Sequence, residues 1–118
     1  MRTIETHAVN GLNEALTLDV LDEPGQGGAC HHYRVSWTPA ETCNIHFQNG
    51  PIKEFGVNGI SGEALLAIVR DRLECFQRGP YVCETNQQAL DHVVAAMGAL
   101  ESRTRERVDR GVEGTNVL

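Results

Sequence analysis

The chain has 118 residues, a formal net charge of −6 and a pI near 5.3. This acidic balance argues against a protein that binds nucleic acid polymers, because such binding depends on a surplus of Lys and Arg. No apolar run approaches the roughly 20 residues that span a bilayer, so we expect no membrane partner.

The first half of the chain, residues 1–60, is predicted to be rich in β-structure. Apolar and polar residues alternate at 15–21, 31–37 and 42–47, as in half-buried strands. The composition of residues 22–28 indicates a loop. Asn49 and Gly50 predict a tight hairpin turn, and Pro51 restricts the returning strand to a sheet edge.

The second half, residues 61–118, is predicted to form a helical hairpin. Ser61 is the expected N-cap of a first helix that Gly79 ends, and Thr85 with Gln88 fits a capping box for a second helix that Gly111 ends. The second helix carries an apolar seam at Leu90, Val93, Met97, Leu100 and Thr104. We therefore predict an α+β fold, an N-terminal antiparallel β-sheet packed on a C-terminal antiparallel helical hairpin in one compact unit. A chain this short also favours a homo-oligomer.

The end of the second helix is the first candidate site. Arg103, Arg107 and Arg110 follow one another at helical spacing, so they share one face and form a candidate clamp for a compact anion such as phosphate. The alternative is that they are ordinary surface arginines, which complement the dipole at a helix C-terminus. The spacing leaves both interpretations open.

The turn of the hairpin is the second candidate site. Phe76 and Tyr81 flank it, and Asn86 opens the second helix. Phe76 is a candidate surface on which a base could stack, and Asn86 is a candidate polar contact to that base. Alternatively, Phe76 only fills the core as the last member of its apolar stripe.

No catalytic, metal or cofactor site is predicted. Cys43 and His46 fall on opposite faces of a strand, whereas zinc needs four converging ligands. The sequence contains no phosphate-binding loop and none of the common catalytic motifs, although an enzyme whose residues assemble in space stays open. The four cysteines include no CxxC pair and the N-terminus has no apolar signal core, so we expect reduced thiols in the cytoplasm.

Four segments resemble a family of small phage proteins, the Thoeris anti-defence proteins of the first type, whose helical hairpin is shared with the phage anti-CBASS sponge. They are Gly28–Tyr33, Phe47–Gly59, Glu63–Val69 and Arg103–Thr115. The resemblance implies a non-catalytic sponge in the cytoplasm of the infected host. It would hold a cyclic ADP-ribose isomer, in some members also cyclic di- or trinucleotides, as a homodimer or a hexamer of three dimers, in a pocket between protomers.

The resemblance also assigns roles to individual residues. Phe76 resembles the aromatic residue that contacts the adenine, and Asn86 resembles its polar partner. Arg103 resembles a basic residue that stacks on the ligand or neutralises it. Lys53 corresponds to the basic residue of a separate cyclic trinucleotide site.

Overall fold

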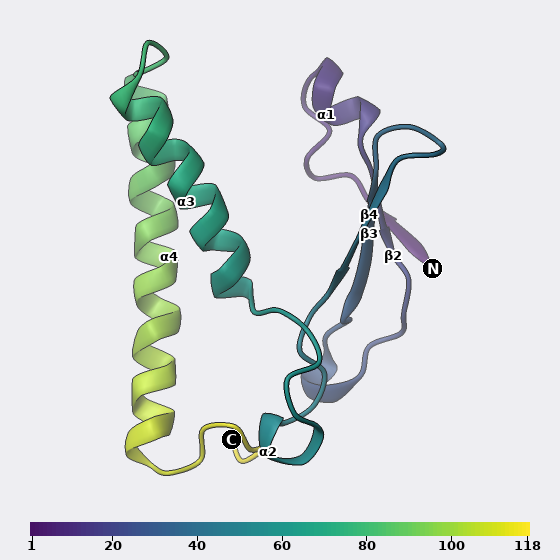
Figure 1. Cartoon of the computed structure of the whole chain (residues 1–118), viewed down its shortest axis with the longest axis vertical. Helices are drawn as coiled ribbons and strands as arrows, with labels where there is room; N and C mark the ends of the chain where they lie inside the picture. The colour runs from purple at the N-terminus through teal and green to yellow at the C-terminus, as the bar shows by residue number, and fades with distance from the viewer. The chain divides into compact units, whose positions relative to one another are not determined.

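The computed structural model describes residues 1–118, apart from the side chain of Gln26, as two compact units, Met1–Ile60 and Ser61–Leu118 (Figure 1). The N-terminal unit is a four-stranded antiparallel sheet in the order β1–β2–β3–β4. Its strands are β1 (Arg2–Ile4), β2 (Thr17–Val20), β3 (His32–Ser36) and β4 (Thr42–His46). Short helical turns lie outside the sheet, namely α1 (Gly11–Ala15), η1 (Gln26–Gly28) and α2 (Ile52–Phe55).

The alternating segments of the sequence do form strands, which confirms the antiparallel sheet and the α+β class. Cross-strand pairing places Leu18 beside Val35 and Val20 beside Tyr33 on one face, and Val20 is fully buried. The other face is polar. On it Arg34 donates to Asp19 over 3.1 Å. The two faces therefore follow directly from the period-2 pattern. The three-residue strand β1 was not predicted, because so short a segment carries too little alternation to detect.

The hairpin predicted at Asn49–Gly50 is wrong. Gly50 takes a positive φ of 85°, but the chain then enters α2 instead of returning as a strand. The side chain of Asn58 closes this segment as a loop, because it accepts from the Asn49 N–H and donates to the Asn49 carbonyl, both over 2.8 Å. A single parallel bridge between Phe47 and Ile60 replaces the expected ladder. The side-chain amide of Asn58 thus makes hydrogen bonds to Asn49 in place of the second strand that the Asn49–Gly50 dipeptide predicted.

A carboxylate organises the loop between β2 and β3. Asp22 accepts hydrogen bonds from the backbone N–H groups of His31 at 2.9 Å and His32 at 3.1 Å. The hydrogen bond from His31 is the main reason that the pKa of the Asp22 carboxyl lies below its ordinary value of 3.8, and the bond from His32 lowers this pKa further. The charged form is therefore the one that the folded loop prefers.

Acidification should weaken this loop. Because the pKa of Asp22 is lowered on folding, its contribution to the free energy of unfolding is complete above about pH 4 and is lost as the pH falls below that value. We expect Asp22→Asn to reduce the steepness of the acid unfolding curve below pH 4, measured by circular dichroism. Glu23→Gln, the neighbouring exposed carboxylate, is the control. An identical acid profile for Asp22→Asn and the parent would contradict this role.

The C-terminal unit is the predicted helical hairpin, made of α3 (Gly62–Arg78) and α4 (Glu84–Asp109). Ser61 caps α3 by accepting the Ala64 N–H over 3.1 Å, as predicted. Gly79 ends α3, and Gly111, with a φ of 74°, follows the end of α4. The seam residues of α4 that the sequence predicted are all half-buried, which confirms its helical period: Leu90, Val93, Met97, Leu100 and Thr104. In the described part of the chain, no helix is both long and apolar enough to cross a membrane.

The capping box predicted at Thr85–Gln88 is wrong. The helix α4 begins at Glu84, with Cys83 as its N-cap, and the Cys83 Sγ atom accepts the Asn86 N–H over 3.4 Å. The side chain of Gln77 holds Cys83 in place, since it accepts from the Cys83 N–H over 3.2 Å and donates to the Cys83 carbonyl over 3.1 Å. The contact from α3 thus determines where α4 starts.

Candidate functional site at the hairpin turn

An aromatic pair lies at the turn between α3 and α4. The rings of Phe76 and Tyr81 meet edge to face with their centroids 6.4 Å apart. The Arg72 guanidinium carbon lies 5.4 Å from the centre of the Phe76 ring, within the range of a cation–π contact. Phe76 is 36% exposed and Tyr81 is 73% exposed, so both rings remain accessible in the protomer. The Phe76 ring is therefore not enclosed within the protomer.

Asn86 completes what we call the turn cluster, Arg72, Phe76, Tyr81 and Asn86. Its side-chain Nδ2 donates to the Tyr81 carbonyl over 3.4 Å, and this contact ties the first turn of α4 to the loop that carries the aromatic ring. The turn cluster combines an aromatic face, a guanidinium and a side-chain amide. These are the groups that recognise a flat heteroaromatic ring with polar edges.

Arg72 is the member of the turn cluster that the sequence analysis missed. It precedes Phe76 by one helical turn, so the two side chains share a face of α3. The i, i+4 spacing was a signal for this contact.

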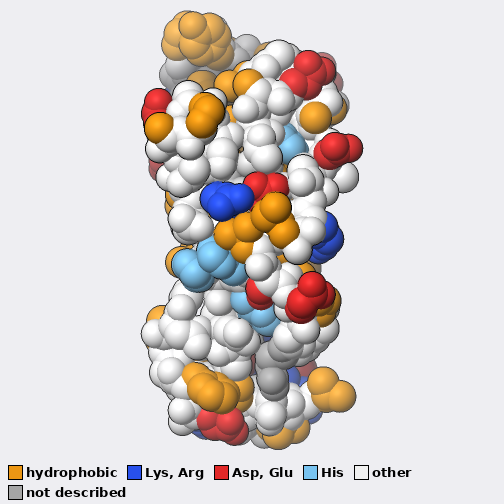
Figure 2. Space-filling view, turned by 90° about the vertical axis from the view of Figure 1, so that its right-hand side faces the viewer, with side chains coloured by type: hydrophobic (Ala, Val, Ile, Leu, Met, Phe, Trp, Pro, Cys, Tyr) orange, Lys and Arg blue, Asp and Glu red, His pale blue; other side chains and the backbone are white. Residues whose placement is uncertain are grey.

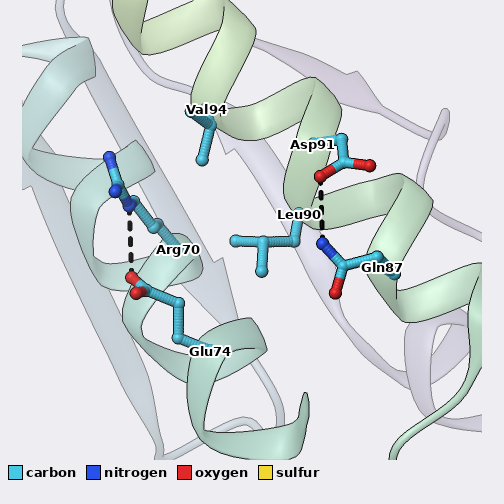
Figure 3. Close-up of a pocket in the computed structure, with 6 residues that line it drawn as sticks. All are labelled: Arg70, Glu74, Gln87, Leu90, Asp91 and Val94. Carbon is cyan, nitrogen blue, oxygen red and sulfur yellow. Dashed lines mark hydrogen bonds and ion pairs between the residues drawn. The ribbon is translucent and has the colours of Figure 1, made fainter.

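A groove of about 300 Å³ runs between α3 and α4 (Figure 3). Leu90 and Val94 supply its apolar surface. Two polar pairs line it as well, because Arg70 donates to Glu74 over 3.1 Å and Gln87 donates to Asp91 over 3.0 Å. The groove therefore has a small apolar floor between polar walls. Within the described side chains, no group of three or more His, Cys, Asp or Glu residues is placed to hold a metal ion.

At the other end of α4, Arg107 is buried and holds the C-terminal segment. Its guanidinium donates to the Glu113 carboxylate over 3.1 Å and to the carbonyls of Val112, Thr115 and Val117 over 3.1, 3.1 and 2.6 Å. These four acceptors occupy the fork of the arginine. Arg107 therefore organises residues 112–118 within the protomer. The spacing of the arginines along the helix could not predict this role, because three of the four acceptors are backbone carbonyls of an irregular segment.

The other arginines near the end of α4 differ in whether they form ion pairs. Arg105 pairs with Glu101 at 2.6 Å, and Arg110 pairs with Glu106. Arg103 is exposed, and in the described part of the chain it has no ion-pair partner. Of the predicted arginine face, Arg103 is thus the member best able to meet an external anion.

The predicted site residues on α4 do not converge within one protomer. Asn86 and Arg103 lie on the same helix, and at 1.5 Å per residue they are about 25 Å apart along its axis. Lys53 is exposed and lies in α2 of the N-terminal unit. A single small ligand cannot touch both Asn86 and Arg103 of the same chain.

Comparison with known proteins gives an informative relative. A protein named Thoeris anti-defense 1, from Bacillus phage SBSphiJ7, is 38% identical to this chain over 92 residues, or 78% of the chain. The chain belongs to the Thoeris anti-defence family of the first type. The match covers 65% of the length of that relative. No family model matches the chain.

Proposed function

We propose that this protein is a phage anti-defence sponge that binds a cyclic ADP-ribose isomer and withholds it from the host immune effector. Two observations support the proposal, and the turn cluster is the one that carries it. The relative in Bacillus phage SBSphiJ7 carries the name Thoeris anti-defense 1. The turn cluster offers an exposed aromatic face, a guanidinium and an amide, which match the purine of such a signal.

The ligand is proposed to lie between protomers. Because Asn86 and Arg103 are about 25 Å apart in one chain, the purine would contact the turn cluster of one protomer while Arg103 of another meets the pyrophosphate. Exposed apolar side chains on the hairpin favour such an assembly, since Ile68 is 60%, Val69 45% and Val94 38% exposed. A homodimer, or a hexamer of three dimers, would cover this surface. Arg107, four residues after Arg103 on α4, enters the proposal as a residue that positions the C-terminal segment.

Lys53 is proposed to serve a second class of ligand, cyclic di- or trinucleotides. It is exposed in α2, whose loop is closed by the hydrogen bonds of Asn58. A single ammonium beside a loop that is closed by hydrogen bonds suits a phosphate group as a point charge. The protein would act in the host cytoplasm during infection.

A thermal-shift panel of cyclic ADP-ribose isomers and cyclic di- and trinucleotides tests the proposal directly. A ligand that binds only the folded state raises the melting temperature. A sponge should also release the ligand chemically unchanged after the protein is denatured by heat. Recovery of a cleaved product would indicate an enzyme instead, and no shift with any member of the panel would favour a module that binds no such ligand.

Replacing Phe76 tests the stacking surface. Phe76→Ala should weaken ligand binding by about 1–3 kcal/mol, the contribution of a stacked base, measured by calorimetry on the folded fraction. Because the ring is 36% exposed, the accompanying loss of stability should be smaller than for a fully buried Phe. Phe76→Tyr keeps the aromatic face and serves as the matched control. If folded Phe76→Ala binds as tightly as the parent, the ring does not stack on the ligand.

A further inference from the structure

Two histidines stack on the polar face of the sheet. His32 of β3 and His46 of β4 are cross-strand partners, and their ring centroids lie 4.1 Å apart with the planes inclined by 20°. Figure 2 shows histidine side chains, in pale blue, beside one another on an exposed face. The next pair along the ladder carries a hydrogen bond, from the Phe47 N–H to the His31 carbonyl over 2.8 Å. The histidine pair is therefore of the non-hydrogen-bonded type, in which facing side chains lie closest.

Asn44 adds an oxygen atom beside this pair. It precedes His46 by two residues on β4, so both side chains lie on the same face of the sheet. The Asn44 Oδ1 atom lies 3.0 Å from His32 Nε2. Two donor atoms that are each about 2.1 Å from one metal ion, at a right angle, are about 3 Å apart. The spacing of this hydrogen-bonded pair therefore also suits two ligands of a shared ion.

We call His32, Asn44 and His46 the His–Asn group. Asn44 and His46 are exposed and His32 is half-buried, so an ion can reach the group from solvent. Arg34 lies opposite Asn44, but its guanidinium donates to the Asp19 carboxylate over 3.1 Å. Because this ion pair balances the charge of Arg34, the group does not lie next to an uncompensated cation.

The donor atoms define the class of ion. Imidazole nitrogen suits Zn²⁺, Cu²⁺ and Ni²⁺, whereas Mg²⁺ and Ca²⁺ prefer a shell of oxygen ligands. The sequence analysis set His46 against Cys43, which falls on the opposite face of the strand. The structure instead brings His46 to His32, a residue of the neighbouring strand whose position only the ladder register determines.

We propose that the His–Asn group binds a divalent transition metal ion, with two imidazole nitrogens and the Asn44 Oδ1 atom as its ligands. The exposed ring of His46 turns about its side-chain bonds to direct a nitrogen at the ion. His32 binds through Nε2 in the neutral tautomer that carries its proton on Nδ1. Water fills the remaining positions, and the ion then links β3 with β4. The site does not depend on the proposed ligand, and it is tested without one.

Calorimetric titration of the untagged protein with NiCl₂ tests the site. Ni²⁺ is the probe because, unlike Cu²⁺, it does not oxidise the exposed thiols of the chain. His32→Gln and His46→Gln should each raise the Kd for Ni²⁺ at least about tenfold, since the remaining imidazole loses the effective concentration of the second. Asn44→Leu keeps the approximate size of the side chain and removes its oxygen, so it should raise the Kd by a smaller factor. A parent Kd in any of these three variants would overturn the three-donor site.

Two control variants separate this site from other metal ligands. His92→Gln removes an exposed histidine of α4, and it should keep the parent Kd. Cys43→Ser removes the exposed thiol of β4, and it should also keep the parent Kd. A loss of affinity in Cys43→Ser as large as that in His46→Gln would overturn the proposal, because the thiol would then be a ligand.

Nuclear magnetic resonance on the unmodified protein gives an independent test that needs no variant to fold. Ni²⁺ held by nitrogen and oxygen ligands is paramagnetic, so substoichiometric NiCl₂ should first shift or broaden the amide signals of the His–Asn group. The amide signals of Cys75 and Cys83, whose thiols are exposed on the helical hairpin, are the control and should stay unchanged at the same ratio. Earlier changes at these cysteines than at His32 and His46 would overturn the proposed site.

Discussion

Arg107→Ala should lower the free energy of unfolding by about 3 kcal/mol, the largest stability effect that we expect from a single substitution in this chain. The guanidinium is buried and donates to one carboxylate and three backbone carbonyls. Its removal leaves the carbonyls of Thr115 and Val117 without a partner among the described residues, whereas the Val112 carbonyl still accepts the Thr115 N–H over 3.1 Å. Glu113 is 41% exposed, so water partly solvates its released charge and the loss stays below that of a fully buried ion pair. Urea unfolding followed by circular dichroism measures the change.

Two further variants define the role of Arg107. Arg105→Ala removes an exposed pair with Glu101 and should change the stability by no more than about 0.5 kcal/mol. Arg107→Lys should recover only part of the loss, since one ammonium cannot reproduce a planar fork that reaches four acceptors. Limited proteolysis should show faster cleavage within residues 112–118 of Arg107→Ala. Equal stabilities of the Arg105→Ala and Arg107→Ala proteins would show that Arg107 does not hold this segment.

Arg103→Ala should produce the largest loss of ligand affinity, about 1.5–3 kcal/mol or roughly 10- to 150-fold in Kd, because a charge-assisted hydrogen bond to the proposed pyrophosphate is removed. Arg103 is exposed and makes no ion pair with the described side chains, so its replacement should leave the stability nearly unchanged. Calorimetric titration with the ligand identified by thermal shift measures the effect.

The matched control for this prediction is Arg105→Ala. It removes the same charge two residues away, but from a side chain that already pairs with Glu101. Its affinity should stay close to that of the parent, and Arg103→Lys should fall between the parent and Arg103→Ala. Equal losses for Arg103→Ala and Arg105→Ala would indicate a diffuse electrostatic effect in place of a specific contact.

The placement of Arg103 also bears on assembly. If its contact with the ligand comes from a second protomer, then mixing Arg103→Ala with Phe76→Ala subunits should restore some complete sites. In a mixed dimer, one site would combine the intact turn cluster of the Arg103→Ala chain with the intact Arg103 of the Phe76→Ala chain, and the other site would lack both. The distance of about 25 Å between Asn86 and Arg103 within one helix is the reason for this expectation.

Local signals in the sequence determined most of the secondary structure. The period-2 pattern located β2, β3 and β4, and the seam from Leu90 to Thr104 with Ser61 and Gly111 located the two long helices. These signals work because each depends on residues that are neighbours along the chain. The candidate aromatic and amide residues, Phe76 and Asn86, also came from the sequence.

Contacts between residues that are distant in the sequence determined the features that the local signals predicted wrongly or left open. Asn58 closes the segment after Asn49 as a loop where the sequence predicted a hairpin. Gln77 holds Cys83, so that Cys83 becomes the N-cap of α4, which begins at Glu84. The sequence assigned Arg103 and Arg107 to one helical face, yet only Arg107 is buried, because acceptors from residues 112–118 surround it. A residue's spacing fixes the face of the helix on which it lies. Its partners come from parts of the chain whose position only the folded structure determines, and they decide whether its charge is satisfied or free to bind.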